Sequence, residues 1–478
     1  MLLTGATGYI GRQLLPVLLG RGRPVRCLVR RPDAFRRTGV RGVDVFVGDV
    51  LRGESLAPAM RGVETAYYLI HAMGAGSDFE ARDRRGAKNF AAAARRAGVR
   101  RIVYLGGLAE EGPDLSTHLR SRHEVGRILR DSDAEVVEFR ASVVIGPGSL
   151  SFELVRSLVE RLPVMICPRW VRTQAQPIAV ADVLEYLSAS LDLPPGQSRI
   201  YEIGGSEKVS YEDVMREYAR QRGLSRWMIR VPVLTPGLSS LWLALVTPVL
   251  ARVGRSLIEG VRTPSVVRDE EALSAFDVRP VGLAAAIAAA LAAEESRFDR
   301  EPVSRLAPLA GRRRPWVLTR FGQRILDSRT LQVAVSPSRA FEPIRTIGGP
   351  VGWYYADWLW RFRGLLDRLV DGPGMRIGQP RRPDVRVGDS IDCWRVVAYE
   401  PGRRLRLLAE MKLPGRAWLE FEVTGSPRSA TIRQTAVFDP KGLAGLLYWQ
   451  LARPAHDRLF AGMLHAIAQA ATHPQSAR

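Results

Sequence analysis

A glycine-rich turn at the start of the sequence constrains the fold of this chain more than any other stretch. It follows a short apolar run, Leu2–Leu3, and precedes a helical pattern of leucines over residues 14–18. Glycines at this spacing let the chain turn tightly, let the backbone approach a pyrophosphate, and let the helix pack closely on a sheet. The N–H groups at the start of that helix then face the anion. We therefore expect a dinucleotide to be bound by Thr4, Gly5, Thr7, Gly8, Tyr9, Ile10 and Gly11.

The strand that follows this helix indicates which dinucleotide is bound. Residues 25–29 form an apolar run that completes the β-α-β unit the motif requires, so a chance spacing in a chain with 44 glycines is the weaker interpretation. The run ends in Arg30 and Arg31, where an acidic residue would bind the ribose 2′-hydroxyl of NAD. Arginine suits a 2′-phosphate, so we predict a preference for NADP(H) over NAD(H). The alternative is a solvated basic edge.

Residues 1–145 alternate short apolar runs with helix-length segments. Further runs lie at 43–47, 65–70, 101–105 and 135–139, and residues 87–97 are typical of the helices between them. This pattern predicts an α/β fold with a doubly wound parallel sheet, the Rossmann arrangement. Ligands of such sheets bind at the carboxyl ends of the strands. That rule adds to the predicted cofactor site Asp49, Val50, His71, Gly106, Gly107, Ala141 and Ser142.

The turn T-G-A-T-G-Y-I-G and the later G-D-V at 48–50 resemble the extended and atypical short-chain dehydrogenase/reductases, a group that includes the NmrA-like NADP-binding proteins. The resemblance covers residues 1 to about 294. It implies that Asp49 and Val50 lie at the adenine and that Ile70 and His71 run beside the cofactor. It also implies that Gly106-Gly107 takes the place of the catalytic serine, and that residues 176–183 close a substrate lobe.

The catalytic pattern of that family is changed in this chain. The family uses Y-x-x-x-K, whose tyrosine is the general acid, together with an upstream serine. Aligning residues 122–129 with the family's K-x-x-x-E-x-x-L places Arg122 at the lysine and His118 at the tyrosine. A histidine can hydrogen-bond a carbonyl or donate a proton, whereas Arg122 would act only as a fixed charge on ribose or phosphate. The other interpretation is a redox-silent fold that uses both residues for contacts.

Composition bounds the remaining possibilities. A chain of 478 residues is too long for one core, so we expect two or three domains. The formal charge of +21 leaves attraction to anionic lipid or nucleic acid open, but no nucleic-acid-binding motif accompanies it, so no specific nucleic acid is predicted. Three scattered cysteines and a first strand at residue 2 favour a cytoplasmic protein. The six histidines lack the spacing of zinc ligands, so we predict no metal site.

Residues 184–294 are expected to form the small substrate lobe, in which Ser210 caps a helix. Within it, residues 241–251 are eleven uncharged residues interrupted by a proline, well short of the ~20 that span a bilayer. A buried helix or a lid over an apolar substrate is the leading interpretation. A shallow peripheral contact with an anionic membrane, at its inner face, stays open because Arg230, Arg252 and Arg255 lie nearby.

Residues 295–315 carry three prolines and no apolar periodicity, so they are predicted to be a linker. A second domain is expected at 316–472, with a strand at 330–335, an aromatic-rich segment at 353–362, a meander of strands at 390–398, 405–411, 417–423 and 430–438, and a helix at 442–471. One apolar stripe of that helix should comprise Leu443, Leu447, Leu451, Leu459, Met463 and Ile467. The arrangement resembles the α+β helix-grip fold of the START/Bet v 1-like (SRPBCC) superfamily, and in particular the domain DUF2867. That resemblance implies an apolar ligand between sheet and helix; the aromatics line such a cavity or form plain core.

The leading hypothesis is an NADP-dependent oxidoreductase of the atypical short-chain dehydrogenase/reductase type. It would reduce a small apolar carbonyl or quinone substrate, with His118 and Arg122 at the reacting end. The alternative is a non-catalytic NADP(H)-binding sensor or scaffold whose C-terminal domain is the ligand-binding or output module.

Overall fold

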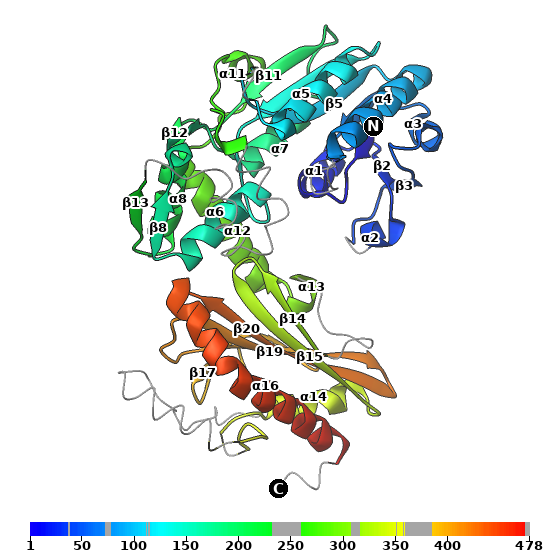
Figure 1. Ribbon diagram of the computed structural model, residues 1–478. Coiled ribbons are helices and arrows are strands. Elements are labelled where there is room, and N and C mark those ends of the chain that lie inside the picture. Colours follow the sequence, from blue (N-terminus) through cyan, green and yellow to red (C-terminus); the bar gives the residue numbers. More distant parts are fainter. Residues whose placement is uncertain are drawn as a thin grey trace. The chain divides into compact units, whose positions relative to one another are not determined.

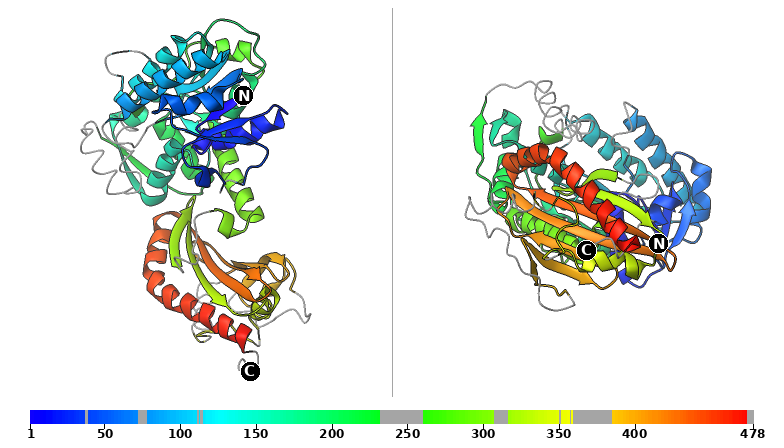
Figure 2. Two further views of the ribbon diagram at one scale, coloured as in Figure 1. Left: turned by 90° about the vertical axis from the view of Figure 1, so that its right-hand side faces the viewer. Right: turned by 90° about the horizontal axis from the view of Figure 1, so that it is seen from below.

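The computed structural model describes residues 1–36, 39–71, 78–110, 112, 115–231, 260–306, 316–349, 351–356, 358 and 385–473. The chain divides into two compact units, Met1–Ala293 and Glu294–Arg478, and each is described by itself (Figures 1 and 2). None of the described helices is long and apolar enough to cross a membrane.

The first unit is built on a seven-stranded parallel sheet in the order β11-β6-β5-β4-β1-β2-β3. The strands are β1 Leu2–Thr4, β2 Arg26–Val29, β3 Asp44–Val47, β4 Thr65–Tyr68, β5 Arg101–Gly107, β6 Glu135–Ala141 and β11 Arg199–Ile203. The order reverses between β1 and β4, which is where doubly wound sheets bind their ligands. The predicted doubly wound parallel fold is confirmed.

Helices cover both faces of this sheet (Figure 1). On one face, α1 Tyr9–Gly20 and α7 Val180–Ala189 bury their leucines and valines against one side of the strands. On the other, α4 Phe79–Ala97 and α5 Thr117–Arg130 pack against the opposite side. Burial on two faces explains why central strands such as β1 and β5 are nearly continuous apolar runs rather than alternating ones. Short helical segments also lie at α2 Pro32–Arg36, η1 Gly53–Leu56 and α3 Ala57–Met60.

A small lobe completes the first unit. Its helices are α6 Leu150–Arg161, α8 Tyr211–Gln221, α11 Glu271–Ala275 and the start of α12 Leu283–Arg300, with η2 Arg169–Arg172. Its strands pair in twos: β7 Val144–Ile145 with β10 Ile178–Ala179, β8 Val164–Cys167 with β13 Trp227–Arg230, and β9 Gln174–Ala175 with β12 Val209–Ser210. Ser210 caps α8, as predicted, in a reciprocal bond with Asp213. Residues 241–251 lie outside the described residues.

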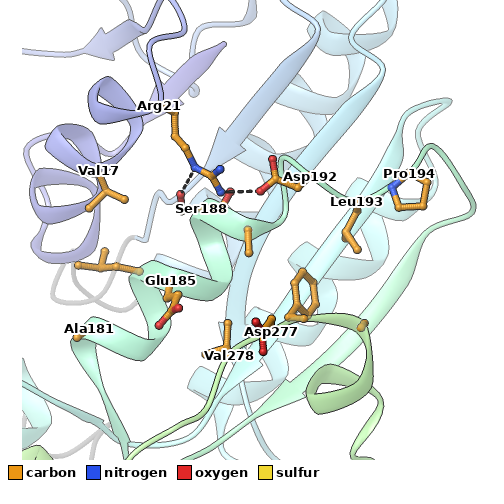
Figure 3. Close-up of a pocket in the computed structure, with 14 residues that line it drawn as sticks. Val17, Arg21, Ala181, Glu185, Ser188, Asp192, Leu193, Pro194, Asp277 and Val278 are labelled. Atoms are coloured by element: carbon orange, nitrogen blue, oxygen red, sulfur yellow. Dashed lines mark hydrogen bonds and ion pairs between the residues drawn. The ribbon is translucent and has the colours of Figure 1, made fainter.

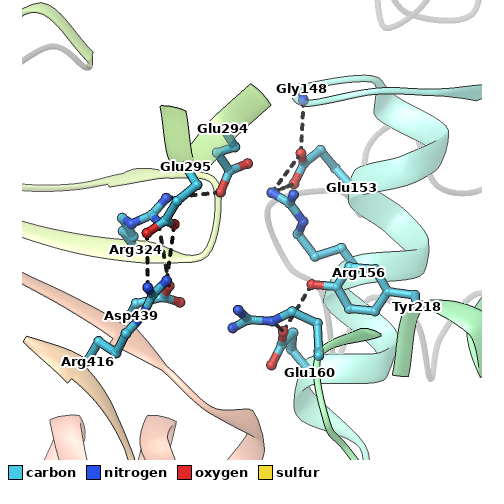
Figure 4. Close-up of polar contacts among 11 residues, drawn as sticks. Gly148, Glu153, Arg156, Glu160, Tyr218, Glu294, Glu295, Arg324, Arg416 and Asp439 are labelled. Carbon is cyan, nitrogen blue, oxygen red and sulfur yellow. Dashed lines mark hydrogen bonds and ion pairs between the residues drawn. The ribbon is translucent and has the colours of Figure 1, made fainter. Parts of the chain in front are cut away.

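Buried polar contacts tie the lobe helices together, as Figure 4 shows. The hydroxyl of Tyr218 on α8 donates to the Glu160 carboxylate on α6 at 3.0 Å. On the same face of α6, Arg156 is paired with Glu153 at 3.2 Å, and Glu153 accepts from the Gly148 backbone N–H. The Tyr218–Glu160 hydrogen bond joins α8 to α6, and the Arg156–Glu153 pair lies within α6.

The second unit contains a seven-stranded sheet in the order β14-β15-β20-β19-β18-β17-β16, in which every neighbouring pair is antiparallel. The strands are β14 Trp316–Phe321, β15 Arg324–Val333, β16 Ser390–Ile391, β17 Trp394–Glu400, β18 Arg404–Ala409, β19 Gly415–Ser426 and β20 Ser429–Pro440. Two helices, α14 Pro337–Arg345 and α16 Gly442–Thr472, pack on it. The predicted meander and C-terminal helix are therefore confirmed.

The predicted start of this domain is wrong in two respects. The sheet begins with the hairpin β14–β15 rather than with a strand at 330–335, and residues 295–306 of the expected linker form the end of α12 and the helix α13 Val303–Leu306. Phe298 is fully buried there, with its ring 4.9 Å from that of Trp418 on β19. Single anchors such as Phe298 leave no periodic signal in the sequence. Residues 307–315 lie outside the described part of the chain.

Ion pairs hold this segment on the sheet (Figure 4). Arg416 of β19 is paired with Glu295 at 2.9 Å and with Asp439 at 3.1 Å. Arg324 of β15 is paired with Glu294 at 3.4 Å, and its guanidinium lies 4.4 Å from the centre of the Phe298 ring. Residues 294–306 are thus an integral part of the second unit.

The apolar stripe predicted for α16 is only half correct. Leu459, Met463 and Ile467 are buried in the core, but Leu443, Leu447 and Leu451 are exposed, the last by 84%. In the N-terminal half of the helix, Trp449 instead faces the sheet and stacks on Phe438. A 3.6-residue period could not show where along a 31-residue helix the buried face changes.

Candidate cofactor and catalytic site

The glycine-rich turn has the geometry of an anion cradle. Gly5 has a φ of +71°, and a Cβ there would lie 2.5 Å from the Leu69 carbonyl oxygen. A Cβ on Gly11 would collide with the Gly5 carbonyl oxygen. Among the described residues no side chain caps the start of α1, and its first turn contains no acid. The first N–H groups of α1 and the positive end of its dipole are therefore available to phosphate.

Two neighbours of the turn also bear on ligand binding. The Thr4 hydroxyl donates to the Tyr67 carbonyl at 2.8 Å and so ties β1 to β4 behind the turn. The Tyr9 hydroxyl lies against Gly146, and burial raises the pKa of Tyr9 to about 12. Within the described residues this buried hydroxyl has no hydrogen-bond partner. Thr7 and Gly8 are exposed, and Ile10 is half-buried, on the open side of the turn.

The residues predicted at the ends of β2 and β3 do follow the carboxyl ends of these two strands. Arg30 and Arg31 follow β2, both are exposed, and within the described ranges no ion pair engages either side chain. The Asp49 carboxylate accepts from the Leu51 N–H at 3.0 Å, which shapes the loop after β3. Val50 is buried, and its carbonyl accepts from the Asn89 side chain at 2.8 Å.

Two histidines meet where β4 and β5 end. His71 Nε2 lies 3.3 Å from His118 Nδ1, and the ring centres are 4.8 Å apart. His71 follows β4, and His118 is the second residue of α5, whose N-terminus Ser116 caps by accepting from the Leu119 N–H. Burial, followed by the charge of Arg122, lowers the pKa of His118 to about 4 and that of His71 to about 2. Both imidazoles are therefore neutral near pH 7.

Arg122 lies close to the two histidines, and its guanidinium is directed toward the sheet. Its guanidinium donates to the carbonyls of Ile70 and Leu105, each at 3.3 Å, which are the ends of β4 and β5. It also lies 3.7 Å from the Asp83 carboxylate and 5.0 Å from the centre of the Tyr104 ring. The side chain is 5% exposed, so its charge is committed to the protein's own backbone and to Asp83. Asp83, in the second turn of α4, carries no sequence signal that would have revealed this role.

The remaining predicted positions lie around the same edge of the sheet. A Cβ on Gly107 would lie 2.7 Å from a methyl group of Leu119, so the place where the family carries serine is filled by α5. Ala141 ends β6, and the next residue, Ser142, donates to the Ser265 carbonyl at 2.8 Å while accepting from the Gln176 N–H. The Ser142 hydroxyl thus joins the sheet to the lobe.

Cavities among the described residues also lie away from these positions. A groove of about 630 Å³ lies between α1, α7 and the loop at 275–278, and in it Arg21 donates to Ser188 and pairs with Asp192 (Figure 3). None of the predicted site residues lines it. In the second unit, an apolar cavity of about 180 Å³ lies between the sheet and α16. Aromatic residues dominate its walls, namely Trp394, Trp418, Phe438, Tyr448, Trp449 and Phe460.

The fold and the glycine-rich turn define the class of protein, a Rossmann-type NAD(P)H-binding protein. A family model described as NAD(P)H-binding matches residues 5–144, and a second, described as a protein of unknown function (DUF2867), matches residues 322–463. The (4-alkanoyl-5-oxo-2,5-dihydrofuran-3-yl)methyl phosphate reductase of Streptomyces griseus is 30% identical over 231 residues, which are 47% of this chain and 74% of the relative. The chain belongs to the NAD(P)H-binding reductase family that includes this relative, and it carries a DUF2867 domain in addition.

Other relatives agree with that placement. Ceramide reductase of Caulobacter vibrioides is 29% identical over 276 residues, covering 55% of this chain and 85% of the relative. Among solved structures, the triphenylmethane reductase of Citrobacter sp. superposes with a TM-score of 0.50 at 16% identity, covering 61% of this chain and 99% of that one. This structural likeness shows the fold alone. The chain is an NAD(P)H-binding, oxidoreductase-like protein.

Proposed function

We propose that this protein is an NADPH-dependent reductase of an apolar carbonyl or quinone compound. The observation that carries the proposal is the pair His71–His118 at the carboxyl ends of β4 and β5, where substrates of doubly wound sheets react. Its relatives include a ceramide reductase, and ceramide is a lipid, which supports an apolar substrate. Bound NADPH would supply a hydride to the carbonyl carbon, and the protein must supply a proton to the oxygen.

The cradle at Gly5, Gly8 and Gly11 fits the pyrophosphate of the dinucleotide. Arg30 is the residue we assign to the 2′-phosphate, with Arg31 beside it, because neither guanidinium is engaged within the described residues. On this basis NADP(H) is preferred over NAD(H). Asp49, Val50, Ile70, Gly106 and Ala141 would contact the rest of the cofactor, mainly through backbone atoms.

The two imidazoles can pass a proton without ever carrying charge. Nδ1 of His118 faces Nε2 of His71, so the free Nε2–H of His118 is the one that donates to the substrate oxygen. As that proton leaves, Nδ1 of His118 takes the proton from Nε2 of His71, and solvent replaces it at Nδ1 of His71. A relay of this kind suits a site where burial and Arg122 disfavour imidazolium.

Arg122 is a positioning residue in this mechanism. By donating to the Ile70 and Leu105 carbonyls, it fixes the two strand ends that present the histidines and the cofactor. Burial, together with the charge of Arg122, keeps both imidazoles neutral. This role differs from the ribose contact that the family pattern implies for the same position.

For the second unit, we propose a helix-grip fold of the START/Bet v 1-like type that holds an apolar ligand. The antiparallel sheet, the long helix α16 and the aromatic cavity between them support this assignment. A cavity of about 180 Å³ holds a short acyl chain or a single ring rather than a whole lipid. The domain would then bind part of the substrate or product.

The test is NADPH oxidation followed at 340 nm with a panel of quinones and apolar aldehydes and ketones. We expect turnover in the wild type and a decrease of roughly a hundredfold or more in kcat for His118→Ala, with NADPH affinity unchanged. His465→Ala, an exposed histidine on α16, is the matched control and should retain full activity. Equal turnover in His118→Ala and wild type would refute the assigned acid.

A second candidate function is a non-catalytic NADP(H)-binding sensor. The observation that favours it is the burial of Arg122, whose guanidinium is engaged with Asp83 and the Ile70 carbonyl and is not presented to a ribose as the family's lysine is. NADPH binding seen by fluorescence, without turnover of any compound in the panel, would establish the sensor in place of the reductase.

A further inference from the structure

The paired strands β8 and β13 of the lobe present a continuous apolar face to solvent. They run parallel, with Trp227 beside Val164 and Ile229 beside Ile166. These four side chains are 75%, 44%, 50% and 41% exposed, respectively. Side chains alternate along a strand, and the opposite face of β8 buries Met165 and Cys167 in the lobe core. Figure 1 shows the two strands at the edge of the lobe, beside α6 and α8.

The surroundings of this face are cationic. Residues 161–174 and 218–231, which contain the two strands, carry seven arginines and no aspartate or glutamate. Three of the seven, Arg220, Arg222 and Arg230, are paired with carboxylates on α6 and α8. Arg169 and Arg172, on the turn directly after β8, are exposed, and no ion pair engages them within the described ranges. The apolar face is thus bordered by uncompensated positive charge.

We propose that this face of β8–β13 docks on the surface of an anionic lipid bilayer. Tryptophan and aliphatic side chains partition into the headgroup and acyl boundary, while neighbouring arginines pair with anionic headgroups. Each such cation adds attraction that salt screens. The chain's formal charge of +21 acts in the same direction at longer range. Nucleic acid would use the arginines but leave four large apolar side chains in water.

The docking is shallow, because none of the described helices could cross the bilayer. Docking requires neither the cofactor site nor turnover. The docking proposal can therefore be tested separately from the proposed reductase activity. A reductase with a lipid substrate would gain from such docking, since the substrate is concentrated in the membrane.

The experiment is sedimentation of the full chain with vesicles of phosphatidylcholine, with and without phosphatidylglycerol. We expect binding only to the anionic vesicles, and a loss of binding when salt is raised from ~0.1 to ~0.5 M. The double variant Trp227→Ser/Ile229→Ser should lower the partition coefficient by roughly tenfold or more, and Arg169→Gln/Arg172→Gln by a similar factor at low salt. The matched control is Val45→Ser/Val47→Ser on β3, where the two valines are 42% and 63% exposed.

Unchanged NADPH binding establishes that each variant is folded. The proposal is overturned if the wild type does not sediment with anionic vesicles, or if the β3 control loses as much binding as the β13 variant. It is also overturned if light scattering shows a dimer that the Trp227→Ser/Ile229→Ser variant converts to a monomer, because the face then binds a second copy of the chain.

Discussion

Acidification should destabilise the first unit through the histidine pair. Burial and Arg122 hold the pKa of His118 near 4 and that of His71 near 2, whereas an unfolded histidine has a pKa near 6.5. In mildly acidic solution the two histidines therefore bind protons in the unfolded chain but not in the folded chain. Stability falls as the pH drops below about 6.5, and the contribution of His118 continues to fall until the pH passes about 4.

The size of the effect follows from these pKa values. At pH 5 an unfolded histidine is about 97% protonated, while His118, with a pKa of about 4, is about 10% protonated. At pH 5 this difference in protonation lowers the free energy of unfolding by about 2 kcal/mol, compared with about 0.2 kcal/mol at pH 7. His71 adds a cost of similar size, so the pair should remove about 2–4 kcal/mol between pH 7 and 5.

The assay is urea unfolding, followed by pulsed hydrogen exchange in peptides from α5, at pH 7 and pH 5. The wild type is compared with His71→Gln/His118→Gln, in which both side chains keep hydrogen-bonding groups but cannot titrate. The wild type should lose about 2–4 kcal/mol more than the variant between the two pH values. If both proteins lose the same stability, the imidazoles are not held neutral and the relay has no basis.

Three further outcomes test the site. Gly11→Ala should weaken NADPH binding more than roughly tenfold in calorimetry, because the new Cβ collides with the Gly5 carbonyl and displaces α1 from the cradle. Arg30→Ser should weaken NADPH roughly tenfold and leave NADH unchanged, since an exposed charge-assisted contact is worth about 1.5 kcal/mol. His71→Gln should lower kcat nearly as much as His118→Ala in the 340 nm assay, whereas a lone acid at position 118 would make the change at 71 almost neutral.

The fold could be predicted from the sequence wherever a local pattern determines the structure. The glycine turn, the apolar runs that become β2 to β6, and the Pro-Gly turns of the meander each specify their own conformation. The end of α12 could not be found this way. Phe298 is buried because an arginine and an aromatic ring from distant strands close over it, and such contacts are invisible in a local window.

The sequence indicated candidate positions for the site but not the contacts between them. The rule that ligands bind at strand ends indicated His71, and the likeness to the family's Y-x-x-x-K indicated His118, yet only the structure shows that α5 brings His118 within 3.3 Å of His71. Arg122 was expected to face the cofactor because it occupies the family's lysine position. The direction in which the Arg122 side chain points is set by Asp83 and by two backbone carbonyls, and a sequence pattern does not encode these partners.

The substitution of His-x-x-x-Arg for Tyr-x-x-x-Lys follows a physical logic. A cation one helical turn away lowers the pKa of its neighbour in either case. For a tyrosine, which ordinarily titrates near pH 10, that shift produces a better acid near neutral pH. For His118, which ordinarily titrates near 6.5, burial and then the charge of Arg122 lower the pKa to about 4, which removes the charged acid at neutral pH and leaves a neutral imidazole. A neutral imidazole gives up its N–H readily only when its other nitrogen gains a proton at the same moment. In the proposed mechanism His71, whose Nε2 lies 3.3 Å from His118 Nδ1, provides that proton, so the two histidines act together.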